Sequence, residues 1–529
     1  MDEARARWGD REALVFEGRR FSFRQLAAEV DRLAKGLIQL GVAPGEKVAI
    51  WLQNCPEWIH AMFACAKIGA VHVPVNTRLR TDDVAYVLRQ SDSTTLITHD
   101  VSGPIDYLSM ARKLTPVAGT LKRLVIKSER THPGTITWAD LLERAREVDD
   151  TTVRARAAAV RSTDTAFVMY TSGTTGFPKG VARDHGLIES LVDRQRRLGM
   201  TERDVFINYL PLSHIFGYVD GPLGSMMVGN RHVLTQGFDP DEALELIERE
   251  GGTQVHGFEG HLKALCDAQE AHPRDLRTLR AGLMALGQAS ATAYRARTVL
   301  APARFLAAYG ITEVGANVSV SLPDATEEQA CETSGYPCEG FALRVVDPET
   351  GREQPRGVAG ELLVQSRYMM QGYYRKPEET ARALDLDGWF HTGDMAIVRA
   401  DGYVRFVGRY KDMLKIGGEN VDPMEVEGYL LQHPDVQQVA VVSYPDPTLT
   451  EVSVAFVQRR PGATVTEAEI VGSCRGRMAS FKVPRHVVFM DELPVTSSGK
   501  IQKAILRERA VPLLDAGGAG IDRRGNRRM

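Results

Sequence analysis

The sequence has few cysteines and no excess of charge of either sign. Its 529 residues include 6 cysteines, none of them in a CxxC pair, which is not the density of a disulfide-stapled secreted domain. Lys and Arg number 65 against 68 Asp and Glu, a formal net charge of −3, and this is not the basic footprint of a nucleic-acid-binding protein. We therefore expect reduced thiols, a cytoplasmic location and no nucleic-acid partner.

Long apolar runs are also missing. The first residues, MDEARARWGDREALVF, have no apolar stretch after their charges, so we expect no signal peptide there. The most apolar stretch, residues 58–75, is interrupted by His60, Lys67 and His72. We expect no transmembrane segment.

The composition is that of a large folded protein. Hydrophobic residues make up 43% and charged residues 25% of the chain, which argues against global disorder. A chain of this length is expected to form two or three domains.

Helical and strand-like stretches alternate in the first part of the chain. Apolar residues recur at helical spacing from Leu26 to Leu40, and strand-like VAIWL follows at 48–52. The same alternation continues with helices at 57–68 and 81–90 and strands at 71–75 and 94–99. The pattern predicts an α/β fold with a largely parallel sheet and helices on its faces, and a region richer in strands from 335 to 364.

The pattern changes after Gly408. Helices are expected at 423–431 and 466–480, and strands at 436–444, 451–458 and 486–492, as in a compact α+β unit. We expect a large domain over residues 1–408, a connection at 409–412, a small domain over 413–510 and a disordered, arginine-containing tail over 511–529.

The most informative segment is AFVMYTSGTTGFPKG, residues 166–180. An apolar strand runs into small and hydroxyl residues and then a lysine: Thr171, Ser172, Gly173, Thr174, Thr175, Gly176 and Lys179. Glycines let backbone amides approach a polyphosphate, hydroxyls add donors, and the lysine adds a mobile positive charge. Phosphate binding is the natural chemistry, although the GxxGxxK spacing followed by Gly180 is not that of a P-loop NTPase.

This segment resembles the signature loop of the adenylate-forming superfamily, the acyl-CoA synthetase or AMP-binding enzymes. Further segments match that family in its own order: LPLSHIFG at 210–217, YGITE at 309–313, GWFHTGD at 388–394, GRYKDMLKIGGEN at 408–420 and PVTSSGKIQK at 494–503. The resemblance spans nearly the whole chain. It implies a large N-terminal domain of sheets, flanking helices and a small β-rich subdomain, followed by a small mobile C-terminal domain.

The resemblance also implies a reaction in two steps, with ATP, Mg²⁺ and coenzyme A. A carboxylate and ATP form acyl-AMP and pyrophosphate, and a thiol then takes the acyl group and releases AMP. Lys500 matches the lysine that bridges the carboxylate and the α-phosphate, where two anions must meet. Glu313 and Thr171 match the contacts to Mg²⁺, which prefers hard oxygen ligands.

Other matched positions imply nucleotide and coenzyme contacts. Asp394 and Arg409 match the ribose contacts, and Tyr309 matches an aromatic residue that stacks on adenine. Lys411 falls on the hinge that swings Lys500 away after adenylation. The remaining implied contacts to the nucleotide or to coenzyme A are Gly310 and Thr312 in YGITE and Lys415, Gly417 and Gly418 in KIGGEN.

His214 and Phe216 match the segment that lines the acyl pocket. Amino-acid adenylation domains place an aspartate in this segment, and HIFG has none, so an amino-acid substrate is disfavoured. Gly287 and Gln288 also border the pocket in the family. Gln288, His256 and Glu259 either make this pocket more polar or face solvent. The acid stays open between a medium- or long-chain fatty acid and an aromatic or cyclic acid.

Two other functions compete with that of an ATP-dependent carboxylate–CoA ligase. One is an acyl-AMP ligase that loads the thiol of a separate carrier protein, and the other is a nucleotide-binding regulator without catalysis. Lys500, Glu313, Asp394 and Arg409 are all present, and a regulator does not need the full set. The oligomeric state stays open, with a homodimer as one alternative.

Overall fold

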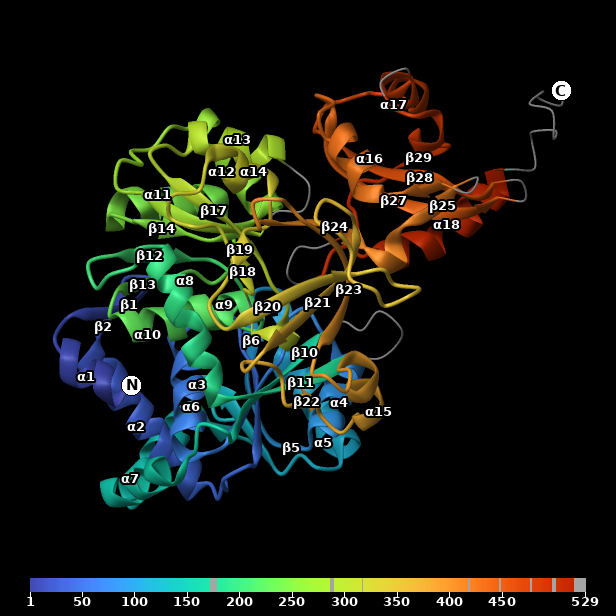
Figure 1. The fold of residues 1–529 in the computed structure, drawn as a ribbon. Coiled ribbons are helices and arrows are strands. Elements are labelled where there is room, and N and C mark those ends of the chain that lie inside the picture. Colours follow the sequence, from blue (N-terminus) through green and yellow to red (C-terminus); the bar gives the residue numbers. More distant parts are fainter. Residues whose placement is uncertain are drawn as a thin grey trace. The chain divides into compact units, whose positions relative to one another are not determined.

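The computed structural model describes residues 1–171, 178–285, 290–315, 317–416, 419–446, 449–475, 478–496 and 501–517 (Figure 1). Side chains are not described at 115–118, 411, 415, 419–420, 450 and 515–517. Packing divides the chain into two units. The first contains residues 1–286, 290–343 and 363–391, and the second contains residues 287–289, 344–362 and 392–529.

The first unit contains an eight-stranded sheet built as the alternation predicts. Its strands run in the order β22 (Gly372–Tyr373), β11 (Lys179–Asp184), β10 (Thr165–Thr171), β4 (Val71–Pro74), β3 (Lys47–Trp51), β5 (Ser93–His99), β8 (Arg123–Lys127) and β9 (Ile136–Thr137). The strands from β10 to β9 are parallel, whereas β11 and β22 are antiparallel to their neighbours. The predicted parallel sheet is confirmed.

Helices cover both faces of this sheet, because its strands bury both sets of alternating side chains. Val48 and Ile50 of β3 share a core with α2 (Phe23–Gln39), α3 (Pro56–Ile68) and α6 (Trp138–Arg144). Ala49 and Trp51 share the opposite core with α4 (Thr81–Ser91) and α5 (Tyr107–Ala118). Smaller elements nearby are α1 (Asp2–Trp8), α7 (Asp150–Ala159), β6 (Val101–Ser102), β7 (Ile105–Asp106) and the 3-10 turn η1 (Ala145–Glu147).

A ten-stranded sheet forms the other part of the first unit. It runs in the order β19 (Tyr336–Pro337), β18 (Ser319–Val320), β17 (Arg304–Tyr309), β16 (Ala281–Ala285), β14 (Gln254–Val255), β12 (Val205–Asn208), β13 (Arg231–Leu234), β1 (Glu12–Phe16) and β2 (Arg19–Ser22), with β15 (Gly257–Phe258) beside β16. Its helices are α8 (Leu191–Arg197), α9 (Ile215–Tyr218), α10 (Gly224–Val228), α11 (Pro240–Glu250), α12 (Glu259–Ala271), α13 (Ser290–Val299) and α14 (Glu327–Glu332). Short turns η2 (His185–Ser190), η3 (Val219–Leu223) and η4 (Thr312–Val314) precede α8, follow α9 and follow β17.

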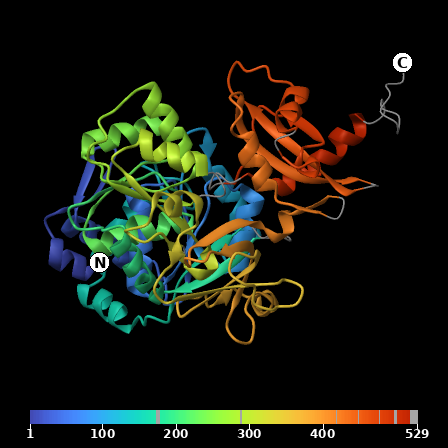
Figure 2. The same ribbon diagram turned by 45° about the horizontal axis from the view of Figure 1, so that its top comes forward.

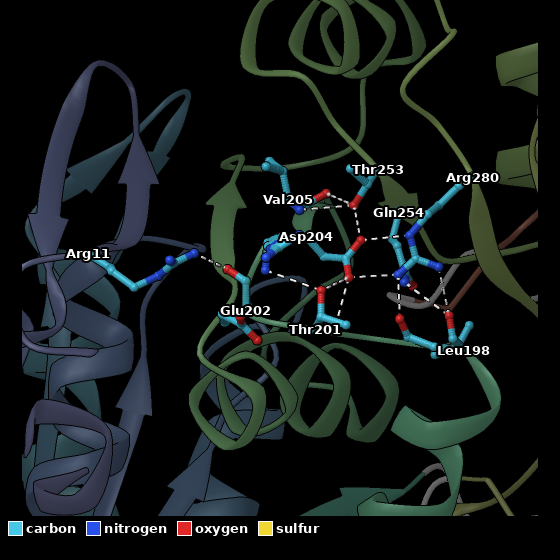
Figure 3. Close-up of polar contacts among 11 residues, drawn as sticks. Arg11, Leu198, Thr201, Glu202, Asp204, Val205, Thr253, Gln254 and Arg280 are labelled. Carbon is cyan, nitrogen blue, oxygen red and sulfur yellow. Dashed lines mark hydrogen bonds and ion pairs between the residues drawn. The ribbon is translucent and has the colours of Figure 1, made fainter. Parts of the chain in front are cut away.

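Asp204 anchors the chain between α8 and β12 (Figure 3). Its carboxylate accepts hydrogen bonds from the Thr253 hydroxyl at 2.7 Å and from Arg280 Nε and Nη2 at 2.8 and 2.7 Å. Arg280 also donates to the Leu198 carbonyl at the end of α8. Burial alone would raise the pKa of Asp204, but the Arg280 and Thr253 hydrogen bonds outweigh it and hold the pKa below its usual value.

We expect Arg280→Ala to lower the free energy of unfolding by about 2 kcal/mol, since it leaves a buried carboxylate without its cation. Because the folded pKa of Asp204 is lowered, its contribution is present above the unfolded carboxyl pKa and is lost as the pH falls through the folded pKa. Urea titrations at pH 7 and pH 3 measure both effects. Arg277→Ala is the control, because Arg277 pairs with Asp275 on the surface; equal losses for both variants would contradict the role of Asp204.

A four-stranded sheet runs in the order β20 (Phe341–Val346), β21 (Gly360–Ser366), β23 (Phe390–Val398) and β24 (Val404–Arg409). The chain passes between the two units within β20, β21 and β23. Helix α15 (Pro377–Ala383) and β22 lie in the segment between β21 and β23. The strands agree with the strand-rich character expected after residue 335. The second unit, defined by packing, begins before residue 409, so the boundary expected there stays a prediction.

The second unit contains a five-stranded sheet, seen from two directions in Figures 1 and 2. Its order is β26 (Glu419–Val421), β25 (Leu414–Ile416), β28 (Thr450–Arg459) and β27 (Val436–Asp446), with β29 (His486–Phe489) parallel to β28. Val439 and Val441 share a core with α16 (Pro423–Leu430) and α17 (Glu467–Cys474). The alternate residues Ala440 and Val442 share another core with α18 (Lys503–Gly517).

Two helix ends in this unit differ from the expectation. Helix α17 ends at Cys474 rather than 480, because Arg475 takes an extended conformation and bridges to Met478. Helix α18 continues to Gly517, so residues 511–517 are helical and not part of an irregular tail. Leu506 and Ala510 are buried one turn apart, and this packing supports the helix beyond residue 510. Residues 518–529 of the expected tail lie outside the described residues.

Candidate active site

Strands β10 and β11 frame the predicted phosphate loop. They are antiparallel, and Thr171 at the end of β10 pairs with Lys179 at the start of β11. The structure therefore describes both ends of the loop. The predicted phosphate contacts Ser172, Gly173, Thr174, Thr175 and Gly176 lie outside the described residues.

Tyr373 connects Lys179 with Glu313. The ammonium of Lys179 lies 4.7 Å from the centre of the Tyr373 ring, a cation–π contact. The Tyr373 hydroxyl donates a hydrogen bond to Glu313 Oε1 at 3.0 Å. Strand β22 places Tyr373 there, because it pairs with β11 at Val181. Two residues expected at the triphosphate are thus brought together by a tyrosine that the motifs do not identify.

Arg183 holds the turn that carries Glu313. Its guanidinium is 1% exposed, donates from Nη1 to the Glu313 carbonyl at 2.8 Å and from Nη2 to the Tyr368 carbonyl at 2.5 Å. Burial lowers the pKa of Arg183 to about 10, against the opposing charges of Asp184 and Glu313, so it stays protonated at neutral pH. The sequence motifs do not identify Arg183, because its neighbours along the chain do not indicate these partners.

The turn ends at Gly315, where only glycine fits. Gly315 has φ +99°, and a Cβ there would lie 2.9 Å from the Leu187 side chain and 3.0 Å from Arg183 Nη2. The residues predicted to contact the nucleotide in this segment lie at the end of β17, which is parallel to β16, or just after it. Tyr309 ends β17 and is buried, Thr312 is buried in η4, and Gly310 lies between them. The ends of parallel strands are where open α/β sheets bind ligands.

The second unit contains the predicted ribose pair. Asp394 of β23 and Arg409 of β24 are opposite each other in the ladder, and Arg409 Nε lies 2.8 Å from Asp394 Oδ1. Asp394 is 2% exposed, whereas Arg409 is partly exposed. A carboxylate held by an arginine is oriented, as an acceptor for two hydroxyl groups must be.

The predicted hinge is tied to helix α18. Lys411 lies in the 3-10 turn η5 (Tyr410–Asp412), and its side chain is not described. The next residue, Asp412, forms an ion pair of 2.6 Å with Arg507 of α18. The last residue of this turn is therefore tied to the helix that begins three residues after Lys500.

A second ion pair fixes the first residue of α18. Lys503 Nζ lies 2.7 Å from Glu427 Oε1, and burial raises the pKa of Glu427 while the Lys503 charge opposes that shift. Lys415 lies in β25, paired with Asn420, and its side chain is not described. Lys500, Gly417 and Gly418 lie outside the described residues.

Aromatic and histidine rings surround the predicted acyl segment. His214 is the N-cap of α9, where its Nδ1 accepts a hydrogen bond from the Phe216 amide at 3.4 Å. Phe216 is stacked on His256 with ring centres 5.8 Å apart, and it meets Phe258 edge-on at 5.5 Å. His214 and Phe216 are therefore part of one ring cluster. Gly287 and Gln288 lie outside the described residues.

His256 is buried rather than solvent-facing. Its Nδ1 accepts the Leu283 amide at 3.1 Å, and burial lowers its pKa to about 3, so the ring is neutral at physiological pH. Glu259 is partly exposed at the first position of α12. The two alternatives for these residues were a more polar pocket and a solvent-facing side chain. The buried position of His256 excludes the second for that residue.

Comparison with known proteins identifies the family. Residues 1–374 match the AMP-binding enzyme model, and residues 425–500 match the C-terminal domain model of the same enzymes. The medium-chain acyl-CoA ligase ACSF2 of Mus musculus is 31% identical over 531 residues, covering 96% of this chain and 86% of that protein. A Mycobacterium tuberculosis CoA ligase, named for a methyl-dioxo-octahydroindenyl propanoyl group, is 34% identical over 502 residues, covering 94% and 96%.

A solved structure is similar over almost the whole chain. The anthranilate CoA ligase AuaEII in complex with anthranoyl-AMP has a TM-score of 0.87 and 30% identity, covering 97% of each chain. Within the residues that our structure describes, no helix has both the length and the apolarity needed to cross a bilayer. The chain belongs to the AMP-binding enzyme family and is an AMP-forming acid–thiol ligase of the acyl-CoA synthetase type.

Proposed function

We propose that this ligase joins a cyclic or aromatic carboxylic acid to coenzyme A through an acyl-AMP intermediate. The observation that carries the proposal is the ring cluster of His214, Phe216, His256 and Phe258 beside the predicted acyl segment. Flat rings favour stacked or edge-on contacts with another ring. The anthranilate ligase and the indenyl propanoyl ligase, both similar over nearly their whole length, support a ring-containing acid.

In this proposal, the first unit holds the triphosphate. Lys179 supplies positive charge at the start of β11, and the loop before it supplies amide and hydroxyl donors. Glu313 and Thr171 supply one carboxylate and one hydroxyl oxygen, a donor set that fits Mg²⁺ arriving with ATP. When bound, the ion would neutralise charge on the phosphates. Arg183 and Tyr373 hold the Glu313 turn in place.

The second unit supplies the remaining contacts. Asp394 accepts hydrogen bonds from the ribose hydroxyls, and Arg409 orients it. Lys500 bridges the carboxylate and the α-phosphate during adenylation, because a cation there offsets the repulsion of two anions. Rotation at Lys411 then removes Lys500 and lets the thiol attack the acyl group, which leaves AMP as the second product.

A pyrophosphate-release screen over benzoic, cinnamic, naphthoic, alicyclic and fatty acids tests the proposal. We expect pyrophosphate with the ring acids, and AMP and a thioester only after coenzyme A is added. A fatty acid as the best substrate would contradict the ring-acid assignment and favour a medium-chain acid, as in the name of the ACSF2 ligase. Thioester formation on a phosphopantetheinylated carrier protein but not on coenzyme A would identify the carrier-loading alternative.

A further inference from the structure

Helix α8 and the turn η3 contain an ion pair whose hydrogen-bonding capacity is unused. Arg194 is 1% exposed and Asp220 is 0% exposed, and Arg194 Nε lies 2.8 Å from Asp220 Oδ1. Although these two atoms are close, they are not oriented as a hydrogen bond requires. Within the described part of the chain, Nε, Nη1 and Nη2 of Arg194 and both oxygens of Asp220 have no hydrogen-bond partner.

Other buried arginines in the same unit show how unusual this is. Arg197, one turn further along α8, donates from Nη1 and Nη2 to the carbonyls of Val320, Tyr336 and Pro337. Arg183 likewise has backbone acceptors for both terminal nitrogens. A buried guanidinium that serves only the fold is satisfied in this way, because unmet donors are costly. Nε lacks a partner in all three arginines, but among the described residues Arg194 also has no acceptor at either terminal nitrogen.

More polar atoms without partners lie around this pair. The side-chain nitrogen and oxygen of Gln195, the next residue of α8, have no partner among the described residues, nor does His256 Nε2. Gln195 reaches the segment that follows Asp220, since a Cβ on Gly224 would lie 2.6 Å from Gln195 Nε2. The charge of Arg194 contributes to the lowered pKa of His256, after the larger effect of burial.

These four residues, Arg194, Gln195, Asp220 and His256, form a polar cluster at the acyl side. Asp220 follows the predicted acyl segment 210–217 by three residues, and His256 is stacked on Phe216 within that segment. The cluster thus borders the ring cluster to which the proposed function assigns the acid. Unused donors and acceptors at that place are what a polar group of the acid would require.

We propose, resting on the proposed function, that the acid carries an uncharged hydroxyl or keto group away from its carboxylate, and that the polar cluster binds this group. Arg194 and Gln195 offer N–H donors, and Asp220 offers an acceptor. The ion pair of Arg194 and Asp220 has no net charge, so a second carboxylate would bring an uncompensated buried charge. A hydroxyl or keto oxygen uses the free donors without that cost.

The test compares acids that differ only at the distant position. One set is cyclohexanecarboxylate with its 4-hydroxy, 4-oxo and 4-carboxy derivatives; the other is 3-phenylpropanoate with its 4-hydroxy and 4-carboxy derivatives on the ring. We expect kcat/KM for pyrophosphate release to be at least about tenfold higher for the hydroxy or oxo acid than for the hydrocarbon and the dicarboxylate. Higher kcat/KM for the hydrocarbon acids would overturn the inference. Higher kcat/KM for the dicarboxylates would overturn the assignment of the bound group as an uncharged hydroxyl or keto group.

The double variant Arg194→Met/Asp220→Val removes both charges together, because removing one would leave the other buried and alone. We expect it to lose the preference for hydroxy and oxo acids over the hydrocarbon acid. Arg196→Met, on the exposed side of the same helix, is the matched control and should keep the wild-type order. An unchanged order in the double variant would overturn the inference.

Circular dichroism shows whether the double variant folds. If it does not, the comparison of acids with the wild-type enzyme still decides the inference. Two kinds of failure are distinguishable. Turnover of ring acids without a preference for the polar derivative contradicts only the polar cluster. No turnover of any ring acid, with turnover of octanoate, contradicts the proposed function and the inference that rests on it.

Discussion

Replacing Lys500 by alanine is expected to lower the rate of acid-dependent pyrophosphate release by about 100- to 1,000-fold, the usual effect of losing one charge-stabilising group in a transition state. The attacking carboxylate and the α-phosphate are both anionic, so their approach requires a cation between them. In the segment PVTSSGKIQK, Lys500 matches that cation. Its neighbour Lys503 is committed elsewhere, to Glu427 at 2.7 Å.

The two half-reactions separate this role from a general loss of folding. With synthetic acyl-AMP and coenzyme A supplied, Lys500→Ala should form the thioester at a rate within a few-fold of wild type. Lys482→Ala is the control, since Lys482 is also in the second unit but pairs with Glu425 at 2.7 Å. A wild-type rate of pyrophosphate release in Lys500→Ala would show that this lysine does not act in adenylation.

Replacing Arg183 by methionine is expected to lower the free energy of unfolding by about 3 kcal/mol and to raise KM for ATP. The buried guanidinium satisfies the carbonyls of Glu313 and Tyr368, and each buried acceptor left unpaired costs about 1–3 kcal/mol. The Glu313 turn would also lose its main support, and Glu313 is the residue proposed to hold the metal ion of ATP.

Urea denaturation and ATP-dependent kinetics measure the two effects of Arg183→Met. Arg196→Met, an arginine that is 64% exposed and pairs with Asp193 and Glu339, should leave both quantities near their wild-type values. If Arg183→Met lowered stability but left KM for ATP unchanged, the Glu313 turn would not depend on Arg183. Unchanged stability would contradict the importance of the two carbonyl contacts.

Local patterns in the chain predict much of this molecule. The alternation of apolar residues predicted the strands β3, β4 and β5 and the largely parallel sheet that contains them, because each helix and strand buries a face set by its own periodicity. The ordered motifs around Thr171, Glu313, Asp394 and Lys500 predicted the family, since their chemistry requires those residue types at short range. Two expectations were wrong. The helix expected to reach residue 480 ends at Cys474, where a bridge between Arg475 and Met478 follows, and the tail expected from residue 511 is helical to Gly517, because α18 packs against the sheet.

The contacts that hold and tune the site come from distant parts of the chain and were not predictable from it. Arg183 meets the Glu313 carbonyl across 130 residues, and Tyr373 meets the Glu313 carboxylate across 60. Arg194 and Asp220 each look like ordinary surface residues in sequence, yet folding buries them side by side. Periodicity and motifs describe neighbours along the chain, whereas the free energy of a buried charge depends on which atoms the fold places next to it.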